Sequence, residues 1–414
     1  MSPARSIVIV GASLAGVNVA HSLREHGCRD RIVLVGGEAH WPYDRPPLSK
    51  TVLTGQMEPA ATALREPDFY AQRDIELRLG QWVTAVDTAR ARLELQEGSP
   101  LAYDALVIAT GARARRMRCL TRFDNVCELR TLDDALRVRH LLADSRRVAV
   151  VGGGFIGTEV AAAIRTSGRD VTLIDTQARL FGRVAGALFG ARAARLHADS
   201  GVVLRLSSEI VDVVEGASGV EALLLSDGAR VPVDLVVVGI GAAPCVEFLA
   251  SSGLAIDDGV LCDASGSAAP GIHAVGDVAR WQEEGGTYAP RGQHWTHALT
   301  QARLVAAHMM AAPAAHNGPH ALMPYVWSDQ HGSRFQFYGE CGGQLRERFY
   351  EAADGRRFAA VYSLDGRVTG VAAFNAAAFF ALSRALVAAG ADVEAMDAHC
   401  VGHLGPCVNA CATS

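Results

Sequence analysis

The 414-residue sequence lacks the features that mark membrane, secreted and nucleic-acid-binding proteins. It has no unbroken run of 18 apolar residues, so no membrane span is predicted. The formal net charge is −5, which argues against nucleic acid as the main partner. The chain enters an expected strand almost at its N-terminus, with no room for a signal peptide, so we expect a cytoplasmic protein.

Cysteine is also not arranged as a disulfide framework would require. The nine cysteines are odd in number and scattered, and no Cys-x-x-Cys pair lies near the N-terminal glycine motif. We expect most of them to be reduced and structural. One group of cysteines and histidines lies close together near the C-terminus: His399, Cys400, His403, Cys407 and Cys411. Its spacing misses the usual zinc patterns, so no metal site is predicted.

Two glycine motifs dominate what is present. Gly11-Ala-Ser-Leu-Ala-Gly16 follows the apolar residues 7–10, and Gly152-Gly-Gly-Phe-Ile-Gly157 follows the apolar residues 148–151. Such glycines permit a tight turn from strand to helix and let a pyrophosphate approach the helix N-terminus. The chain is therefore predicted to bind two dinucleotides, and proteins that do so usually move electrons between them.

The second motif is the more regular one. Its predicted strand, helix and strand cover residues 148–151, 158–167 and 171–174. Asp175 follows directly, where a carboxylate can accept hydrogen bonds from both ribose hydroxyls and would repel a 2′-phosphate. This favours NADH over NADPH, although Arg179 and Arg183 lie slightly further on and leave NADPH as the alternative.

The first motif departs from the pattern in two ways. Ser13 occupies the middle glycine position, and the next strand, residues 32–35, runs into Gly36 and Gly37 before any acid appears. We predict Glu38 as the ribose ligand, one residue later than expected.

The order of apolar strands indicates an internal repeat. After each glycine motif, a second apolar strand occurs further along the chain, at residues 106–109 and 235–238, and each is followed closely by glycine. Residues 271–277 contain one more buried strand, which is followed by an acid. We therefore predict an α/β fold with two doubly wound, Rossmann-like nucleotide-binding domains, the second inserted into the first, and a C-terminal α+β domain. The predicted domains are residues 1–112 with 244–313, residues 113–243, and residues 314–414, with linkers near residues 111–118 and 241–244. A helix over residues 371–389 is expected to cover a small C-terminal sheet.

Four further motifs make the prediction specific: Pro42-Tyr-Asp-Arg-Pro-Pro-Leu-Ser-Lys50, Ala109-Thr-Gly111, Gly276-Asp277 and Trp327-Ser-Asp-Gln330. In this order, and over nearly the whole chain, they resemble the FAD-dependent, NADH-dependent ferredoxin reductases of bacterial oxygenase systems. The resemblance implies a glutathione-reductase-like arrangement in which FAD occupies the first motif and NADH the second.

The resemblance also implies the site residues. Those assigned to FAD are Gly11, Ser13, Ala15, Gly16, Glu38, Arg45, Pro46, Lys50, Val83, Ala109, Thr110, Gly111, Arg130, Gly276, Asp277 and Trp295. Those assigned to NADH are Gly152, Gly154, Phe155, Ile156, Gly157, Glu159, Asp175 and Gly241. Lys50, Glu159 and Trp327 are expected to act at the reaction centre.

Each of these assignments has a structural alternative. An amine of Lys50 beside flavin N5 would favour hydride acceptance, but the residue could instead be a solvated lysine. Trp327 and Trp295 are expected near the isoalloxazine or in a hydrophobic core. Glu159, expected on the first turn of its helix, either reaches the nicotinamide or complements the helix dipole.

As implied by the resemblance, hydride passes from NADH to FAD, and single electrons then pass to a 2Fe-2S ferredoxin. That ferredoxin would supply a haem-thiolate monooxygenase or a Rieske dioxygenase. Arg65 and Arg303 are the candidate docking residues of a monomer or weak dimer, whereas the arginines of residues 113–118 could be a solvated linker.

Two other functions remain open. A disulfide or peroxide reductase needs a redox cysteine after the second strand, and residues 40–50 contain none. An apoptosis-inducing-factor-like protein would sense NADH and act by binding partners. The chain also departs from the family at Gly37, where an acid is common, and in the cysteine-rich end from Cys400.

Overall fold

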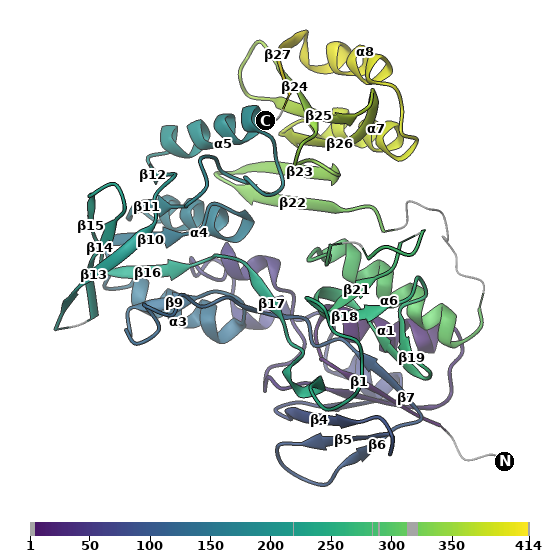
Figure 1. Ribbon diagram of the computed structural model, residues 1–414. Coiled ribbons are helices and arrows are strands. Elements are labelled where there is room, and N and C mark those ends of the chain that lie inside the picture. Colours follow the sequence, from purple (N-terminus) through teal and green to yellow (C-terminus); the bar gives the residue numbers. More distant parts are fainter. Residues whose placement is uncertain (1–4, 218, 284, 289, 313–321, 413–414) are drawn as a thin grey trace. The chain divides into compact units, whose positions relative to one another are not determined.

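The computed structural model describes residues 5–217, 219–283, 285–288, 290–312 and 322–412 (Figure 1). The chain forms two compact units. Unit 1 comprises Met1–Asp44, Ala60–Arg113 and Ala242–Leu322, and unit 2 comprises Arg45–Pro59, Ala114–Gly241 and Met323–Ser414. Two of the points at which the chain passes from one unit to the other, after Arg113 and after Gly241, lie within the expected linkers. The short strands β8 (Ala112–Ala114) and β17 (Ala242–Pro244) lie there. The domain boundary predicted after residue 313 falls outside the described residues.

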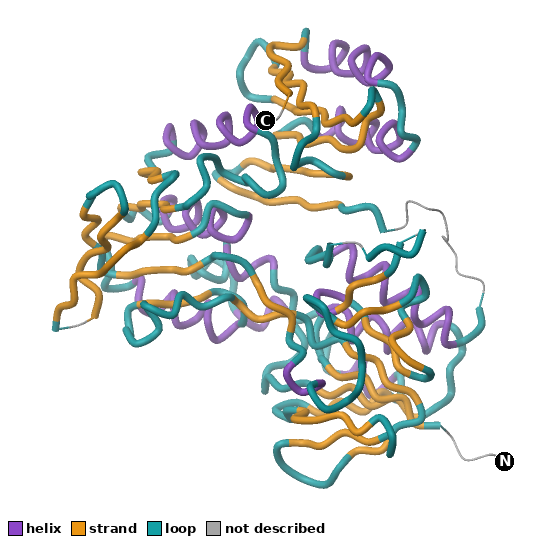
Figure 2. Tube along the Cα trace, in the orientation of Figure 1, coloured by secondary structure: helices purple, strands orange, loops and turns teal. Residues whose placement is uncertain are grey.

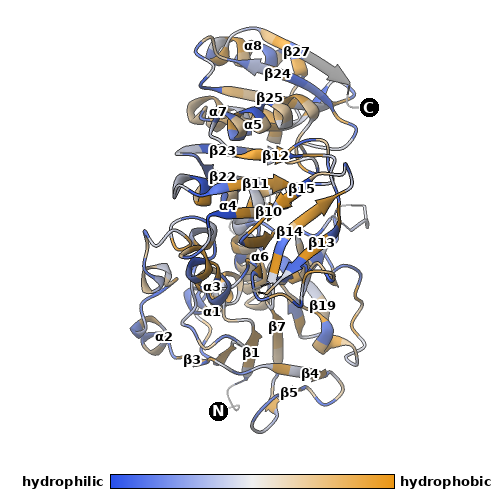
Figure 3. Cartoon of the chain, turned by 90° about the vertical axis from the view of Figure 1, so that its left-hand side faces the viewer, coloured by the Kyte–Doolittle hydropathy of each residue, from blue (hydrophilic) through white to orange (hydrophobic). Residues whose placement is uncertain are grey.

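Unit 1 is built on a six-stranded sheet in the order β19-β20-β7-β1-β2-β3. The central strand β1 (Ser6–Val10) pairs in parallel with β2 (Arg31–Val35) and β7 (Ala105–Ile108). These strands are continuous apolar runs buried on both faces, as parallel strands covered by helices require. Figure 3 shows β7 coloured toward the hydrophobic end of the scale.

The other elements of unit 1 complete the sheet or cover it. The helices are α1 (Leu14–Glu25), α2 (Asp68–Gln72) and α6 (Trp295–Met309), with short 3-10 turns η2 (Pro59–Thr62), η3 (Glu247–Leu249) and η4 (Gly276–Val278). The remaining strands are β3 (Ile75–Arg78), β4 (Val83–Asp87), β5 (Arg92–Leu95), β6 (Leu101–Ala102), β18 (Val260–Cys262), β19 (Ser267–Ala269), β20 (Ile272–Ala274) and β21 (Ala279–Trp281).

Unit 2 contains a second parallel sheet in the order β12-β11-β10-β16-β9. Its central strand β10 (Arg147–Val151) lies between β11 (Asp170–Ile174) and β16 (Leu235–Val238). The helices α3 (Leu132–Leu142), α4 (Phe155–Thr166) and α5 (Ala187–Asp199) pack on it (Figure 2). The remaining elements of this part are η1 (Pro46–Ser49), β9 (Val126–Glu128), β12 (Val203–Arg205), β13 (Ile210–Gly216), β14 (Gly219–Leu225) and β15 (Arg230–Pro232).

The C-terminal part of unit 2 is an antiparallel sheet with two helices. Its strand order is β22-β23-β26-β25-β24-β27. The strands are β22 (Tyr325–Gln330), β23 (Ser333–Gly339), β24 (Arg346–Glu351), β25 (Phe358–Leu364), β26 (Arg367–Phe374) and β27 (Cys407–Ala412), and the helices are α7 (Ala377–Ala388) and α8 (Val393–Leu404). This is the α+β arrangement expected from the sequence.

The helix predicted over residues 371–389 is wrong for its first six residues. Val371 to Phe374 are the buried end of β26, which lies between β23 and β25. The chain then turns at Asn375, whose φ is +50°, before α7 begins. A continuous apolar run carries no periodicity that separates a buried strand from a buried helix, so the alanine content misled the prediction.

Candidate functional site

The two glycine loops have the same backbone geometry. Gly11 has φ of +116° and Gly152 has φ of +114°, a region that glycine alone adopts readily. A Cβ at Gly11 would lie 2.1 Å from the carbonyl oxygen of Ala109, and a Cβ at Gly152 would lie 2.3 Å from that of Gly239. Each loop is therefore pressed against the neighbouring strand and tolerates no side chain there.

The helix that follows each loop begins equally close to it. A Cβ at Gly16 would lie 2.0 Å from the carbonyl oxygen of the first loop glycine, and one at Gly157 would lie 1.8 Å from its counterpart. The middle position differs: a Cβ at Gly154 would meet nothing within 4 Å, and Ser13 takes the corresponding place in the first loop. Both are N-cap residues; Ser13 forms no capping hydrogen bond with its side chain, and Gly154 has no side chain to form one. The open side of each loop, beside a helix N-terminus, fits the pyrophosphate of a dinucleotide.

Asp175 and Glu38, the acids predicted to bind ribose after β11 and β2, do not occupy equivalent positions. The backbone N–H of Asp175 donates to the last residue of the adjacent strand at 2.9 Å, and Gly36 makes the matching bond in unit 1 at 2.8 Å. Glu38 thus lies two residues beyond the position of Asp175. Its Oε2 accepts a hydrogen bond from the Tyr43 hydroxyl at 2.5 Å, which fixes the carboxylate despite its later position.

Asp175 is itself held by the backbone around it. Its carboxylate accepts hydrogen bonds from the N–H groups of Gly153 and Gln177. The carboxylate is thereby fixed beside the second glycine loop. The Arg183 guanidinium lies 3.7 Å from the position of a Cβ at Gly241, at the end of the neighbouring strand β16.

Gly37 lies against the ring of Trp82, a residue that the sequence did not single out. A Cβ at Gly37 would lie 2.6 Å from the ring of Trp82, so the acid expected at this position would require that ring to move. The Trp82 side chain is 58% exposed and directly precedes Val83, the first residue of β4. A glycine followed much later by an exposed tryptophan gives no pattern from which this contact could have been predicted.

The carboxyl ends of the parallel strands of unit 1 gather most of the residues assigned to FAD. A Cβ at Gly276 would lie 3.1 Å from the Cβ of Ala15, so the loop of Asp277 adjoins the first glycine loop. Gln301 accepts a hydrogen bond from the Gly276 N–H at 2.8 Å, and its buried Nε2 has no hydrogen-bond partner among the described residues. This unsatisfied donor fits a site completed by a ligand.

Two further parts of that edge are positioned by long-range hydrogen bonds. Trp295, the first residue of α6, donates from Nε1 to Asp44 Oδ1 at 2.8 Å. The turn Ala109–Gly111 follows β7, and Thr110 donates to the Cys245 carbonyl at 2.9 Å.

Unit 2 contains an ion pair between Lys50 and Glu159, two of the residues expected at the reaction centre. Lys50 follows η1, and its Nζ lies 2.7 Å from Glu159 Oε2, with side chains 20% and 6% exposed. α4 begins at Phe155, so Glu159 is not on the first helical turn as predicted, and the described first turn holds no acid. Because the helix dipole acts mainly within the first turn, it does not explain why a carboxylate occupies position 159.

Three donors surround the Glu159 carboxylate. Ser49 Oγ donates to Oε2 alongside Lys50, and Ser328 Oγ donates to Oε1 at 2.5 Å. An ionised carboxylate is an acceptor only, and this arrangement fits that form. The sequence did not single out Ser49, whereas Ser328 lies within the Trp327 motif and points into the protein.

The remaining residues assigned to the site are spread over unit 2. Arg45 donates from Nη1 to the carbonyl oxygen of Arg130 at 2.5 Å, which connects the Pro46 turn to the carboxyl end of β9. The Trp327 ring lies 5.8 Å from that of Tyr325. Trp327 belongs to β22 of unit 2, whereas Trp295 belongs to α6 of unit 1.

Three buried thiols are not suited to redox catalysis. Burial raises the pKa of Cys127 to about 11 and the pKa values of Cys262 and Cys400 to about 12. Reactive cysteines instead have lowered pKa values and access to solvent. This disfavours a disulfide reductase.

The described residues also contain no group of three or more His, Cys, Asp or Glu side chains that could hold a metal. In the C-terminal group the His399 ring stacks on Phe379 at 5.0 Å, and Cys400 is buried. Within the described ranges, no helix is long and apolar enough to cross a membrane.

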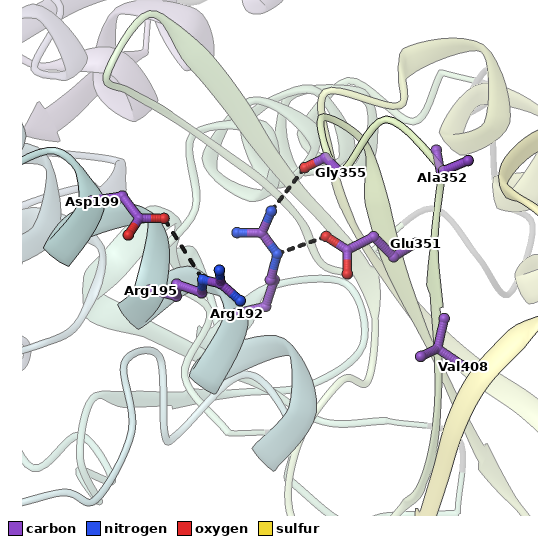
Figure 4. Close-up of a pocket in the computed structure, with 8 residues that line it drawn as sticks. Arg192, Arg195, Asp199, Glu351, Ala352, Gly355 and Val408 are labelled. Atoms are coloured by element: carbon purple, nitrogen blue, oxygen red, sulfur yellow. Dashed lines mark hydrogen bonds and ion pairs between the residues drawn. The ribbon is translucent and has the colours of Figure 1, made fainter.

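A surface pocket lies between α5 and β24, apart from every predicted site residue (Figure 4). Arg192 donates to Glu351 at 2.7 Å and to the Gly355 carbonyl at 2.8 Å, while Arg195 lies 3.8 Å from Asp199. Both arginines already have partners, so the pocket is not an obvious anion site.

Basic side chains cluster in unit 1. The guanidinium groups of Arg65 and Arg73 lie 5.2 and 4.3 Å from the centre of the Phe69 ring. Burial lowers the pKa of His21, and the positive charges of Arg65, Arg73 and Arg303 lower it further against an opposing effect of Glu25. We call Arg65, Arg73 and Arg303 the basic patch.

Comparison with known proteins agrees with this geometry. Residues 5–302 match the pyridine nucleotide-disulphide oxidoreductase family, and residues 325–399 match the reductase C-terminal family. The chain belongs to the pyridine nucleotide-disulphide oxidoreductase family. Within it, the chain is 37% identical to terpredoxin reductase of a Pseudomonas species over 89% of each chain. It is 35% identical to the ferredoxin–NAD(+) reductase component of the biphenyl dioxygenase system of Paraburkholderia xenovorans over 96% of each chain.

Solved structures show the same relationship. The reductase in a covalent putidaredoxin reductase–putidaredoxin complex superposes with a TM-score of 0.88 at 35% identity, covering 94% of both chains. A ferredoxin reductase from Rhodopseudomonas palustris also superposes with a TM-score of 0.88, at 32% identity, covering 94% of this chain and 96% of that chain. The family resemblance and the predicted fold, two nucleotide-binding domains with a C-terminal domain, are confirmed.

Proposed function

We propose that this chain is an NADH-dependent, FAD-containing reductase that passes electrons to the ferredoxin of an oxygenase system. The observation that carries this proposal is the pair of geometrically equivalent glycine loops at Gly11 and Gly152, each at the carboxyl edge of its own parallel sheet. Relatives that span nearly the whole chain are named ferredoxin–NAD(+) reductases. When bound, NADH supplies a hydride to FAD, and the reduced flavin supplies single electrons.

The glycine loops and the carboxylates proposed to bind ribose divide between the two cofactors by unit. Unit 1 supplies the FAD loop with Ser13, the Glu38 carboxylate for the ribose, and the Asp277 turn. Unit 2 supplies the NADH loop with Gly154 and the Asp175 carboxylate for the ribose hydroxyls. The proposed domains remain residues 1–112 with 244–313 for FAD, 113–243 for NADH, and 314–414.

Lys50 and Glu159 have complementary roles in this proposal. Lys50 places its ammonium beside the flavin, and Glu159 fixes that ammonium through the 2.7 Å ion pair. Ser49 and Ser328 hold the carboxylate of Glu159 from two sides, so that it does not rotate away from Lys50. Trp327 is proposed to cover the flavin from β22.

The proposed electron acceptor is a 2Fe-2S ferredoxin that serves a haem-thiolate monooxygenase or a Rieske dioxygenase. Electron-transfer partners bind weakly and are steered by charge, and the basic patch around Arg65 and Arg303 fits an acidic partner. The protein is proposed to act in the cytoplasm as a monomer or weak dimer.

The test is a visible spectrum of the purified protein followed by anaerobic mixing with NADH and, separately, NADPH. The proposal predicts an oxidised flavin spectrum that NADH bleaches much faster than NADPH. Absence of a flavin spectrum after reconstitution with FAD would overturn it.

A further inference from the structure

A buried chain of polar side chains runs away from Glu159 through the C-terminal part of unit 2. Gln330 Nε2 donates to Ser328 Oγ at 2.8 Å and to Thr158 Oγ1 at 2.9 Å. Gln330 Oε1 faces His197 Nε2 at 2.8 Å. Thr158, His197, Gln330 and Ser328 are all at most 2% exposed, so water does not replace these bonds.

The hydrogen bonds from His197 through Gln330 and Ser328 to Glu159 all have the same donor-to-acceptor direction. Because the Gln330 amide donates to Ser328 and Thr158, its oxygen must accept, and His197 must carry a proton on Nε2. Ser328 accepts from Gln330 and donates to Glu159. Along the path from His197 through Gln330 and Ser328, each donor therefore points toward the Glu159 carboxylate, and aligned hydrogen bonds of this kind polarise and strengthen one another. Thr158 lies on a side branch and donates to the backbone carbonyl groups of Gly154 and Phe155 instead.

The outer end of the chain is held by a second histidine. His331 Nε2 lies 3.2 Å from His197 Nδ1, and the rings meet edge to face at 4.7 Å. Burial lowers the pKa of His197 to about 4, with His331 adding to the effect, so His197 is neutral at physiological pH. A neutral His197 with its proton on Nε2 must accept at Nδ1, which His331 satisfies.

The backbone at His331 supports a specific role for that residue. β22 and β23 are joined by a two-residue turn in which His331 and Gly332 have φ of +50° and +69°. Such turns favour asparagine, aspartate or glycine. Histidine is not among the residues that this turn favours, but its ring packs against His197. Residues held in unfavourable backbone conformations are concentrated at functional sites.

We propose that Gln330 and His197 are positioning residues that hold Glu159, and through it the ammonium of Lys50, in the orientation needed for flavin reduction. This inference rests on the proposed function, in which Lys50 adjoins the flavin. Loss of the chain would let Glu159 and Lys50 shift together, although neither Gln330 nor His197 is expected to touch a cofactor.

The test compares FAD-loaded variants at two positions. Gln330→Met removes the amide at similar volume, and His197→Leu removes the ring donor. His197→Gln keeps an Nε2 donor for Gln330 and serves as the conservative rescue. Tyr362→Phe is the matched control, because it removes another buried polar group of unit 2, one bonded to Glu347 and Gly186 instead of this chain.

Four quantities are measured for each variant: the FAD content, the melting temperature, the stopped-flow rate constant of flavin reduction at saturating NADH, and the midpoint potential of the bound flavin. Small misplacements of a catalytic group cost up to about a hundredfold in rate. We expect Gln330→Met and His197→Leu to slow reduction about tenfold and to make the potential more negative, since a displaced ammonium stabilises the reduced flavin less. We expect His197→Gln and Tyr362→Phe to match the wild type in rate and potential.

Lys50→Met separates this inference from the proposed function. If Lys50→Met lowers both the rate and the potential while FAD-loaded Gln330→Met and His197→Leu match the wild type, the positioning role is overturned and the proposed function stands. If Lys50→Met leaves both unchanged, the proposed role of Lys50 is itself wrong, and the inference falls with it. A loss of rate in Tyr362→Phe equal to that in Gln330→Met would also overturn it, because destabilisation alone would then account for the effect.

Discussion

The glycines within one nucleotide-binding motif have different structural roles. Gly152 and Gly157 face backbone oxygens at distances that no Cβ can occupy, so they are needed for the fold. Gly154 faces open space and is needed only if something approaches it. The contrast separates the structural part of the motif from the binding part.

The two kinds of glycine give opposite predictions when each is changed to alanine. Gly154→Ala should fold normally and raise the KM for NADH about tenfold, or about 1.4 kcal/mol, because its Cβ enters the space left for the pyrophosphate. Gly157→Ala should instead lose stability, because its Cβ would meet a carbonyl oxygen at 1.8 Å. Thermal unfolding and steady-state kinetics distinguish the two, and a normal KM in Gly154→Ala would contradict the assignment of this loop to NADH.

Only some of the candidate site could be predicted from the sequence. Lys50 and Glu159 follow from motifs, but the fold alone brings Ser49 and Ser328 to Glu159 and Gln330 to Ser328. No local pattern connects residues 49, 159 and 328. The contact of Trp82 with Gly37 is likewise long-range, so Gly37 could be recognised only as a departure.

At the scale of elements, burial of polar side chains connects helices to the C-terminal sheet. Glu347 on β24 accepts hydrogen bonds from the backbone N–H groups of Leu188 and Phe189, in the first turn of α5. Later in the same helix, His197 reaches Gln330 on β22. α5 is thus tied to this sheet near both of its ends.

This arrangement predicts a pH-dependent stability. The pKa of His197 is about 4 when folded and about 6.5 when unfolded, so between these values the unfolded chain binds the extra proton and acid favours unfolding. Its contribution is fully retained above pH 6.5 and is lost as the pH falls toward 4, on the order of 3 kcal/mol. Chemical denaturation across this range should show a steeper loss for the wild type than for His197→Gln. Equal slopes would show that His197 is not buried as a neutral group.

Elements were predicted well where the sequence signal was strong. The strands β1, β10 and β16 are short apolar runs bounded by glycine, and the predicted residues fall within the observed strands. The failure at β26 came from an alanine-rich run that continues from a buried strand into α7. There, long-range pairing with β23 and β25 decides the structure.

At the scale of the whole molecule, the proposed function requires that unit 1 recognise an acidic ferredoxin. The net charge is −5, so attraction of an acidic ferredoxin has to come from a local concentration of arginine. The basic patch provides it, whereas Arg113 lies 2.5 Å from Glu247 and is already paired.

Charge reversal tests the docking surface. Arg65→Glu with Arg303→Glu should raise the KM for ferredoxin at low salt by about tenfold or more, because steering charges act mainly on association. Reduction of the flavin by NADH should not change. Arg205→Glu with Arg230→Glu alters the net charge equally at exposed positions of unit 2 and is the control. An unchanged KM in the first variant, or an equal rise in both, would contradict the basic patch as the docking site.

The central claim is that electrons from NADH leave this protein through a ferredoxin. The most direct measurement is anaerobic: the FAD-loaded protein in catalytic amount is mixed with NADH and a panel of 2Fe-2S ferredoxins, and both reactants are followed by absorbance. The account predicts that about two ferredoxin molecules are reduced for each NADH consumed, since the cluster takes one electron at a time. Flavin that NADH reduces and that no ferredoxin of the panel reoxidises would contradict it and would favour an NADH-sensing binding protein.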